Sequence, residues 1–156
     1  MLAVEACRAH PLSSGFTPQG ELSQAQQCLQ EAGDRFVFLC IHYPILNRRG
    51  EAYGPKTRAL SNAEDVTDFV ARESKISAIL HGHEHHGFQT ILNAGGRPIT
   101  ILNPGASGYA YLPDRNRTAH LNIYDVTKSG IQSIQRMRFN GSDFEPEPGG
   151  AYASGR

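Results

Sequence analysis

Phe36-Val37-Phe38-Leu39-Cys40-Ile41-His42-Tyr43-Pro44 decides the fold, together with Ile79-Leu80-His81-Gly82-His83-Glu84-His85. Each stretch carries an apolar run that ends in histidine. Short apolar runs are typical of buried parallel strands, which are covered on both faces. Loops at the carboxyl ends of such strands carry polar side chains into a crevice. The two stretches therefore predict a polar site at one edge of a parallel sheet.

The histidines favour a metal or phosphoester site at this edge. Imidazole is the commonest protein ligand for transition metals, and it binds through the ring nitrogen that carries no proton. His83 and His85 are two residues apart, Gly82 permits a tight turn before them, and His42 follows another apolar run. A single histidine would be explained more simply as a surface or core residue. The arrangement of three makes the metal site the favoured interpretation.

The segments around the first two runs predict strand-helix units of an α/β (α+β) fold. Ser23 and Ser61 each begin a capping-box spacing, and apolar residues recur at helical intervals after both. Gly33 is suited to end the first helix. The expected elements, in order, are a short strand over residues 2–6, a helix over 23–32, a strand over 36–41, a helix over 61–73 and a strand over 76–80.

The second half of the chain has a different pattern. Four strand-like runs, at residues 88–92, 98–102, 120–126 and 131–139, are separated by glycine-rich or polar turns and predict an antiparallel meander. A turn at residues 103–108 interrupts them, and it is expected either near the site or as an ordinary glycine turn. Residues 1–140 are expected to form one domain. Residues 141–156 have little apolar content and are expected to be a disordered tail.

The composition excludes several classes of protein. The chain has 156 residues with a formal net charge of zero and 39% hydrophobic residues, which is enough for one core. No basic surface for nucleic acid is expected. No apolar run is long enough for a signal peptide or a membrane span, and the three cysteines lack a Cys-x-x-Cys spacing. A cytoplasmic location is the expectation.

The histidine motifs resemble those of the calcineurin-like metallophosphoesterases. Gly82-His83-Glu84-His85 resembles the Gly-His-x-His motif of that superfamily, and His42-Tyr43-Pro44 resembles its His-His-Pro segment. The material between the motifs resembles the branch that includes cyclic-nucleotide phosphodiesterases. The resemblance covers residues 2–139 and only the second half of the family's domain. It implies the C-terminal half of a four-layer αββα sandwich.

The resemblance also implies a ligand set. His42 and His83 would bind one metal ion and His85 another, in a pair of divalent or trivalent Fe, Mn or Zn ions. Four further residues would lie near the substrate, although each arginine is also a normal surface residue: Tyr43, Arg48, Arg49 and His86. The acidic motifs Asp-x-His, Gly-Asp-x-x-Asp and Gly-Asn-His do not occur, since Gly33-Asp34 lacks the second aspartate.

Two functions follow as hypotheses. The first is metal-dependent hydrolysis of a small phosphoester, with cyclic nucleotides among the candidates, weak or absent in this chain alone because the carboxylate ligands are missing. The alternative is a non-catalytic metal-binding or interaction remnant of the same fold. A zincin-type protease is excluded because Gly87 stands where its second histidine is needed. Half of a sandwich would expose an apolar flank, so we expect a homodimer or a missing N-terminal segment.

Overall fold

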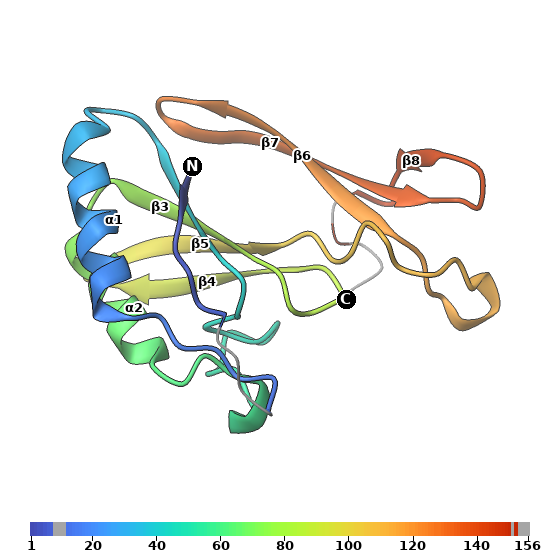
Figure 1. The fold of residues 1–156 in the computed structure, drawn as a ribbon. Coiled ribbons are helices and arrows are strands. Elements are labelled where there is room, and N and C mark those ends of the chain that lie inside the picture. Colours follow the sequence, from blue (N-terminus) through green and yellow to red (C-terminus); the bar gives the residue numbers. More distant parts are fainter. Residues whose placement is uncertain (8–11, 151, 153–156) are drawn as a thin grey trace.

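The computed structural model describes residues 1–7, 12–150 and 152, and it contains two β-sheets with helices beside the larger one (Figure 1). The larger sheet has the order β1-β2-β3-β5-β4, in which β1, β2, β3 and β5 are parallel and β4 is antiparallel to β5. Its strands are β1 (Leu2–Ala3), β2 (Val37–Ile41), β3 (Ile76–His81), β4 (Phe88–Ala94) and β5 (Arg97–Asn103). The mixed α/β class is confirmed.

Two α-helices, α1 (Gln19–Glu31) and α2 (Ala63–Arg72), cover one face of this sheet (Figure 1). The face of α2 predicted to be buried, formed by Val66, Phe69 and Val70, lies in the core. Short 3-10 helices occupy Lys56–Arg58 and Pro113–Arg115. The helix caps differ from the expectation: Pro18 precedes α1, and Ser23 lies inside it with its hydroxyl bonded to the Gln19 carbonyl.

The predicted single meander is wrong, because its strands are divided between two sheets. β4 and β5 form a hairpin, but β5 also pairs with β3 and so belongs to the parallel sheet. Residues 104–119 then lead to a separate antiparallel sheet of β6 (His120–Thr127), β7 (Gly130–Phe139) and β8 (Phe144–Pro146). The period-two pattern identified the strands but carried no information about which partners they choose.

Part of the tail expected to be disordered is packed. β8 pairs with β7, and Glu147, which follows β8, is only 5% exposed. The sequence pattern gave this segment too little weight because much of its packing comes from backbone pairing and polar contacts with β7, with only a few apolar contacts such as that of the Phe144 ring with Phe139. Residues 151 and 153–156 of that tail lie outside the described part of the chain.

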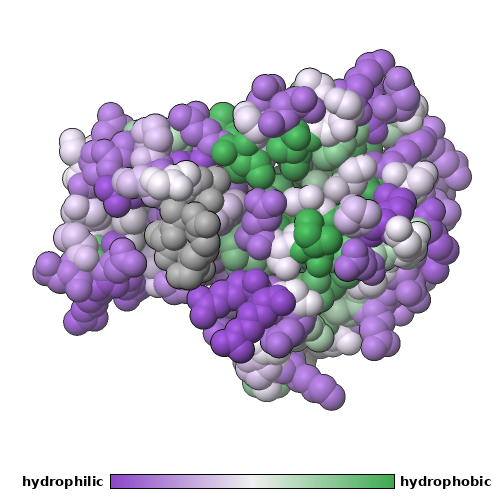
Figure 2. Space-filling view, turned by 180° about the vertical axis from the view of Figure 1, so that it is seen from behind, coloured by the Kyte–Doolittle hydropathy of each residue, from purple (hydrophilic) through white to green (hydrophobic). Residues whose placement is uncertain are grey.

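The second sheet packs on the face of the first that the helices leave open. Phe38 of β2 contacts Phe36 at a ring-centroid distance of 5.0 Å and Tyr124 of β6 at 5.8 Å. Seen from behind, hydrophobic residues form separate patches among polar ones (Figure 2). No helix in the described part of the chain is long and apolar enough to span a membrane.

Candidate functional site

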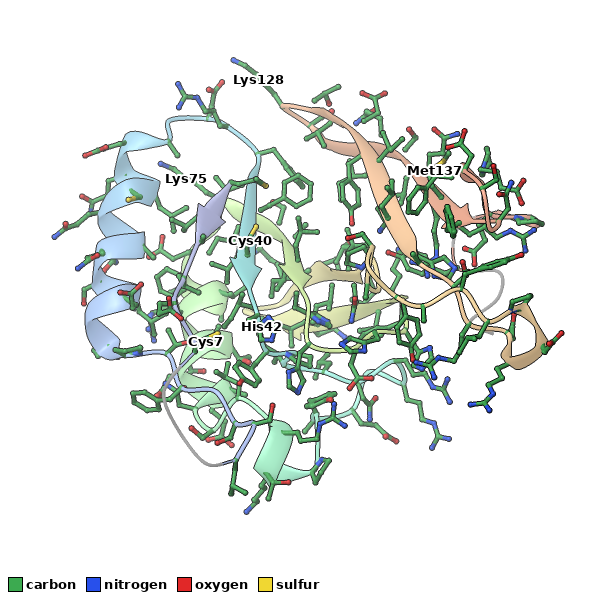
Figure 3. All side chains as sticks on the ribbon, turned by 45° about the vertical axis from the view of Figure 1, so that its right-hand side comes forward. Cys7, Cys40, His42, Lys75, Lys128 and Met137 are labelled. Atoms are coloured by element: carbon green, nitrogen blue, oxygen red, sulfur yellow. The ribbon has the colours of Figure 1, made fainter. Side chains whose placement is uncertain are left out.

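The parallel pairing of β2 and β3 brings His42 and His83 together. Ile41 is opposite His81 in the register, so the residues after both strands emerge at the same edge, and the Gly82 amide donates to the His42 carbonyl at 3.1 Å. The two imidazole rings lie edge to face with centroids 5.4 Å apart. Figure 3 shows His42 just beyond the end of β2. The predicted juxtaposition of these two histidines is present.

A tight turn presents His83. The Glu84 amide donates to the Gly82 carbonyl at 2.7 Å, which closes a three-residue turn with His83 at its centre. His83 has a φ of +63°, an unusual value for a residue with a side chain. Strained backbone of this kind costs energy and is concentrated at functional sites. The turn therefore makes His83 a candidate functional residue.

Asn103, at the end of β5, forms hydrogen bonds with the backbone of this turn. It is fully buried, and its side-chain amide donates to the carbonyls of Gly82, at 3.3 Å, and Glu84, at 3.1 Å. Its carbonyl oxygen accepts from the Gly105 amide at 2.8 Å. Three backbone groups of two loops are thus fixed by one side chain. Asn103 is a positioning residue for the histidine turn.

The surroundings of His83 favour the neutral form of its imidazole. The ring of Tyr43 lies under it at a centroid distance of 4.7 Å. Burial lowers the pKa of His83, and the neighbouring His42 and Arg58 lower it further. Its Nε2 atom is buried and has no hydrogen-bond partner among the described residues. A neutral imidazole with an unpaired nitrogen is the form that binds metal ions.

Glu84, the carboxylate between the two motif histidines, is engaged by the long loop after β2. It accepts a short hydrogen bond from the Tyr53 hydroxyl and lies 4.0 Å from the Arg58 guanidinium. Burial, with the bond to Glu84, raises the pKa of Tyr53 to about 12. The loop is therefore tied to the motif by a neutral phenol and an ion pair.

His85 and His86 point to a different environment, a cleft of about 890 Å³. Their rings contact Tyr109 at centroid distances of 5.3 and 5.9 Å, and the guanidinium of Arg117 lies 4.3 Å from the Tyr109 centroid. Arg48 and Arg49, two of the residues expected near a substrate, also line this cleft. The volume is within the range of small-molecule sites.

The other predicted residues lie elsewhere. Tyr43 is buried in the core beneath His83 and is not among the residues that line the cleft. His42 lines a second, more apolar cavity of about 550 Å³ together with His81. Burial lowers the pKa of His81 to about 4, and its ring packs on Phe88 with centroids 5.1 Å apart.

The described residues fit a metal site only in part. His42 and His83 offer two facing imidazoles, and the unpaired Nε2 of His83 is a suitable ligand atom. Within residues 1–7, 12–150 and 152, however, no three His, Cys, Asp or Glu side chains are placed to hold one ion. A pair of dications held by neutral imidazoles alone would repel strongly. The described residues therefore lack the carboxylate ligands that a pair of metal ions needs.

The sequence patterns do not identify several residues that contact the site from segments distant in the chain. In the sequence, Asn103 indicates only the start of a turn, and Tyr53 and Arg117 lie in loops without a motif. The Asn-Pro-Gly sequence at residues 103–105 signals a turn but not the buried bonds of the asparagine. Such bonds depend on long-range pairing of β5 with β3.

Comparison with known proteins gives no family assignment. No protein-family model matches the chain, and the search of curated proteins finds no significant match.

Proposed function

We propose that this chain provides the histidine side of a metal-dependent phosphoesterase site, in a fold related to the calcineurin-like metallophosphoesterases. The facing rings of His42 and His83 at the carboxyl ends of adjacent parallel strands carry this proposal. The order of the layers also supports the proposal. A helical layer, a mixed sheet and an antiparallel sheet are stacked in this chain, and the same three layers are adjacent in the four-layer sandwich of that family.

In this proposal, the histidines bind metal ions and the arginines of the cleft bind the substrate. Metal ions would supply an acidified water and charge relief on the phosphoryl oxygens. His42 and His83 would bind one ion, and His85, which lines the cleft, would bind a second. The arginines of the cleft, Arg48 and Arg49 among them, would hold the anionic substrate. Carboxylate ligands are required in addition, so we expect slow hydrolysis by this chain alone.

Metal titration tests the proposal. Thermal unfolding would be followed while MnCl2 or ZnCl2 is added to the wild-type chain and to a double variant, His42→Ala with His83→Ala. A complete site at 100 times its Kd stabilises by about 2.7 kcal/mol. We expect a smaller shift for the wild type and none for the double variant. His86→Ala is the matched control, because His86 is an exposed histidine of the same loop.

Two results would count against the proposal. If the double variant responds to metal as the wild type does, the paired imidazoles are not the ligands. If the purified chain rapidly cleaves bis(4-nitrophenyl) phosphate in the presence of metal, the carboxylates are not needed and the division of ligands is wrong.

A non-catalytic metal-binding or interaction module is the second candidate. The observation in its favour is that Glu84, the carboxylate nearest in sequence to the histidines, is already engaged by Tyr53 and Arg58. This candidate predicts a metal response equal to that of the first but no hydrolysis above the rate of metal in buffer. A measurable rate that disappears with His83→Ala would exclude it.

A further inference from the structure

The cleft carries more positive charge than is needed to bind the single negative charge of a phosphodiester. Seven arginines and three glutamates line it, which leaves a surplus of four positive charges before any histidine is counted. They come from both sides of the cavity, namely the loop after β2 and the segment around β6 and β7. In Figure 3, nitrogen atoms are frequent among the side chains to the right of His42.

Three of these arginines are neutralised by the protein. Arg58 pairs with Glu84, Arg136 pairs with Glu147 at 2.9 Å, and Arg138 pairs with Glu145 at 2.8 Å. The charges of these guanidinium groups are therefore balanced by carboxylates of the protein itself.

The other four arginines have no such partner. Arg48, Arg49, Arg115 and Arg117 have no carboxylate within 4 Å among the described residues. Glu51, the remaining acidic residue of the wall, is bonded by the Asn47 side chain at 3.0 Å. With Glu145 counted against Arg138, the four unpaired arginines and Glu51 leave a surplus of three positive charges, carried by side chains of two different loops.

Arg117 carries a more specific signal. Its guanidinium lies over the Tyr109 ring, and its Nε atom is buried with no hydrogen-bond partner in the part of the chain that the structure describes. Arg117 also lines the cleft, so the other nitrogens of its guanidinium can donate to an anion bound there. Tyr109 also contacts His85 and His86. An anion bound by Arg117 would thus lie on the wall that continues to the histidine motif.

We propose that the cleft binds small molecules that carry a chain of two or more phosphates. A cyclic nucleotide has one negative charge, whereas a diphosphate or triphosphate has several, spaced so that separate phosphates can reach arginines of both loops. Guanidinium groups suit phosphate oxygens because they donate two parallel hydrogen bonds. This inference narrows the substrate class of the proposed function. Binding of the phosphate chain does not depend on that function, but the claim that the bound molecule is a substrate does.

Calorimetric binding of inorganic phosphate, pyrophosphate and triphosphate tests the proposal, with EDTA present so that metal plays no part. We expect affinity to rise along this series, with triphosphate at least about tenfold tighter than phosphate. Arg48→Ala with Arg49→Ala, and separately Arg115→Ala with Arg117→Gln, should each weaken triphosphate binding by about tenfold or more. The first pair is exposed, so its loss leaves folding intact.

The control variant is Arg35→Ala with Arg72→Ala, which removes two exposed arginines that do not line the cleft. Equal affinities for phosphate and triphosphate would overturn the proposal, as would equal weakening by the control variant. Absence of saturable triphosphate binding would also overturn it. His42→Ala with His83→Ala should retain triphosphate binding while losing the metal response, which distinguishes failure of this inference from failure of the proposed function.

Discussion

Asn103 is the residue on which the shape of the histidine turn depends most. Its side chain is fully buried and makes three hydrogen bonds to backbone groups, two of them in the turn around His83. Asn103→Ala would remove the side-chain partner of the Glu84 carbonyl and of the Gly105 amide, and one of the bonds to the Gly82 carbonyl, which also accepts from the Glu84 amide. We expect a loss of about 2–4 kcal/mol in the free energy of unfolding, measured by urea denaturation.

The matched control is Asn93→Ala, because Asn93 is an exposed asparagine on the neighbouring β4. Its replacement should change stability by about 0.5 kcal/mol or less. If the two variants are equally stable, the hydrogen bonds of Asn103 do not hold the turn. A metal response that survives in Asn103→Ala would show that His83 keeps its position without them.

His120, the first residue of β6, makes stability depend on pH. Burial lowers its pKa, and Arg136 lowers it further, while Glu147 opposes the shift; Thr118 and Arg138 also face it. The unfolded chain therefore takes up a proton near pH 6.5, where the folded chain does not. Stability contributed by neutral His120 is present at higher pH and is lost as the pH falls below about 6.5.

His120→Gln should reduce this loss. We expect the drop in unfolding free energy between about pH 7.5 and about pH 5.5 to be smaller in the variant than in the wild type. Urea denaturation at the two pH values measures it. An unchanged drop would mean that the buried His120 ring is as easily protonated in the folded chain as in the unfolded one.

At the scale of elements, Arg97 connects three secondary structures. It lies at the start of β5, and its guanidinium donates to the carbonyls of Val70 and Glu73 at the end of α2. It also donates to the carbonyls of Ser74 and Ile76, which lead into β3. The carbonyls of the last helical turn, such as that of Val70, lack partners within the helix, and the Glu73 carbonyl also accepts from the Ile76 amide.

Arg97→Ala should destabilise the fold by about 1–3 kcal/mol, because four carbonyl contacts are lost and only some regain water. Arg97→Lys should give an intermediate loss, since an ammonium group cannot span the same four oxygens. Arg72→Ala, an exposed arginine of α2, is the control. Thermal or urea unfolding distinguishes these variants, and equal stability of Arg97→Ala and Arg72→Ala would contradict the role assigned to Arg97.

The elements also show what sequence could and could not predict. The apolar runs identified β2 and β3, and the helical spacing identified the buried face of α2, because these patterns are local. The pairing of β5 with β3 was missed since it joins strands separated by β4. The same distinction holds for the site: adjacent parallel strands bring His42 and His83 together, whereas Asn103 and Arg117 reach the site through contacts between distant segments.

At the scale of the whole molecule, a buried ion pair ties the C-terminal segment to both sheets. Arg136 of β7 is 4% exposed, lies 2.9 Å from the Glu147 carboxylate through Nε, and donates through Nη1 to the Pro104 carbonyl after β5 at 2.6 Å. The Glu147 carboxylate also accepts from the Tyr152 amide at 2.9 Å. This cluster explains why a segment with few apolar residues is packed.

Glu147→Gln should therefore destabilise the molecule strongly, because it leaves the buried Arg136 guanidinium without its counter-charge. Removal of one partner of a buried pair costs about 3–5 kcal/mol, whereas replacement of both partners costs much less. A double-mutant cycle with Arg136→Met and Glu147→Leu measures the coupling, and urea denaturation gives each stability. We expect the double variant to be more stable than the sum of the single losses implies. Additive losses would show that Arg136 and Glu147 act independently, and that the tail is held by its backbone pairing with β7 alone.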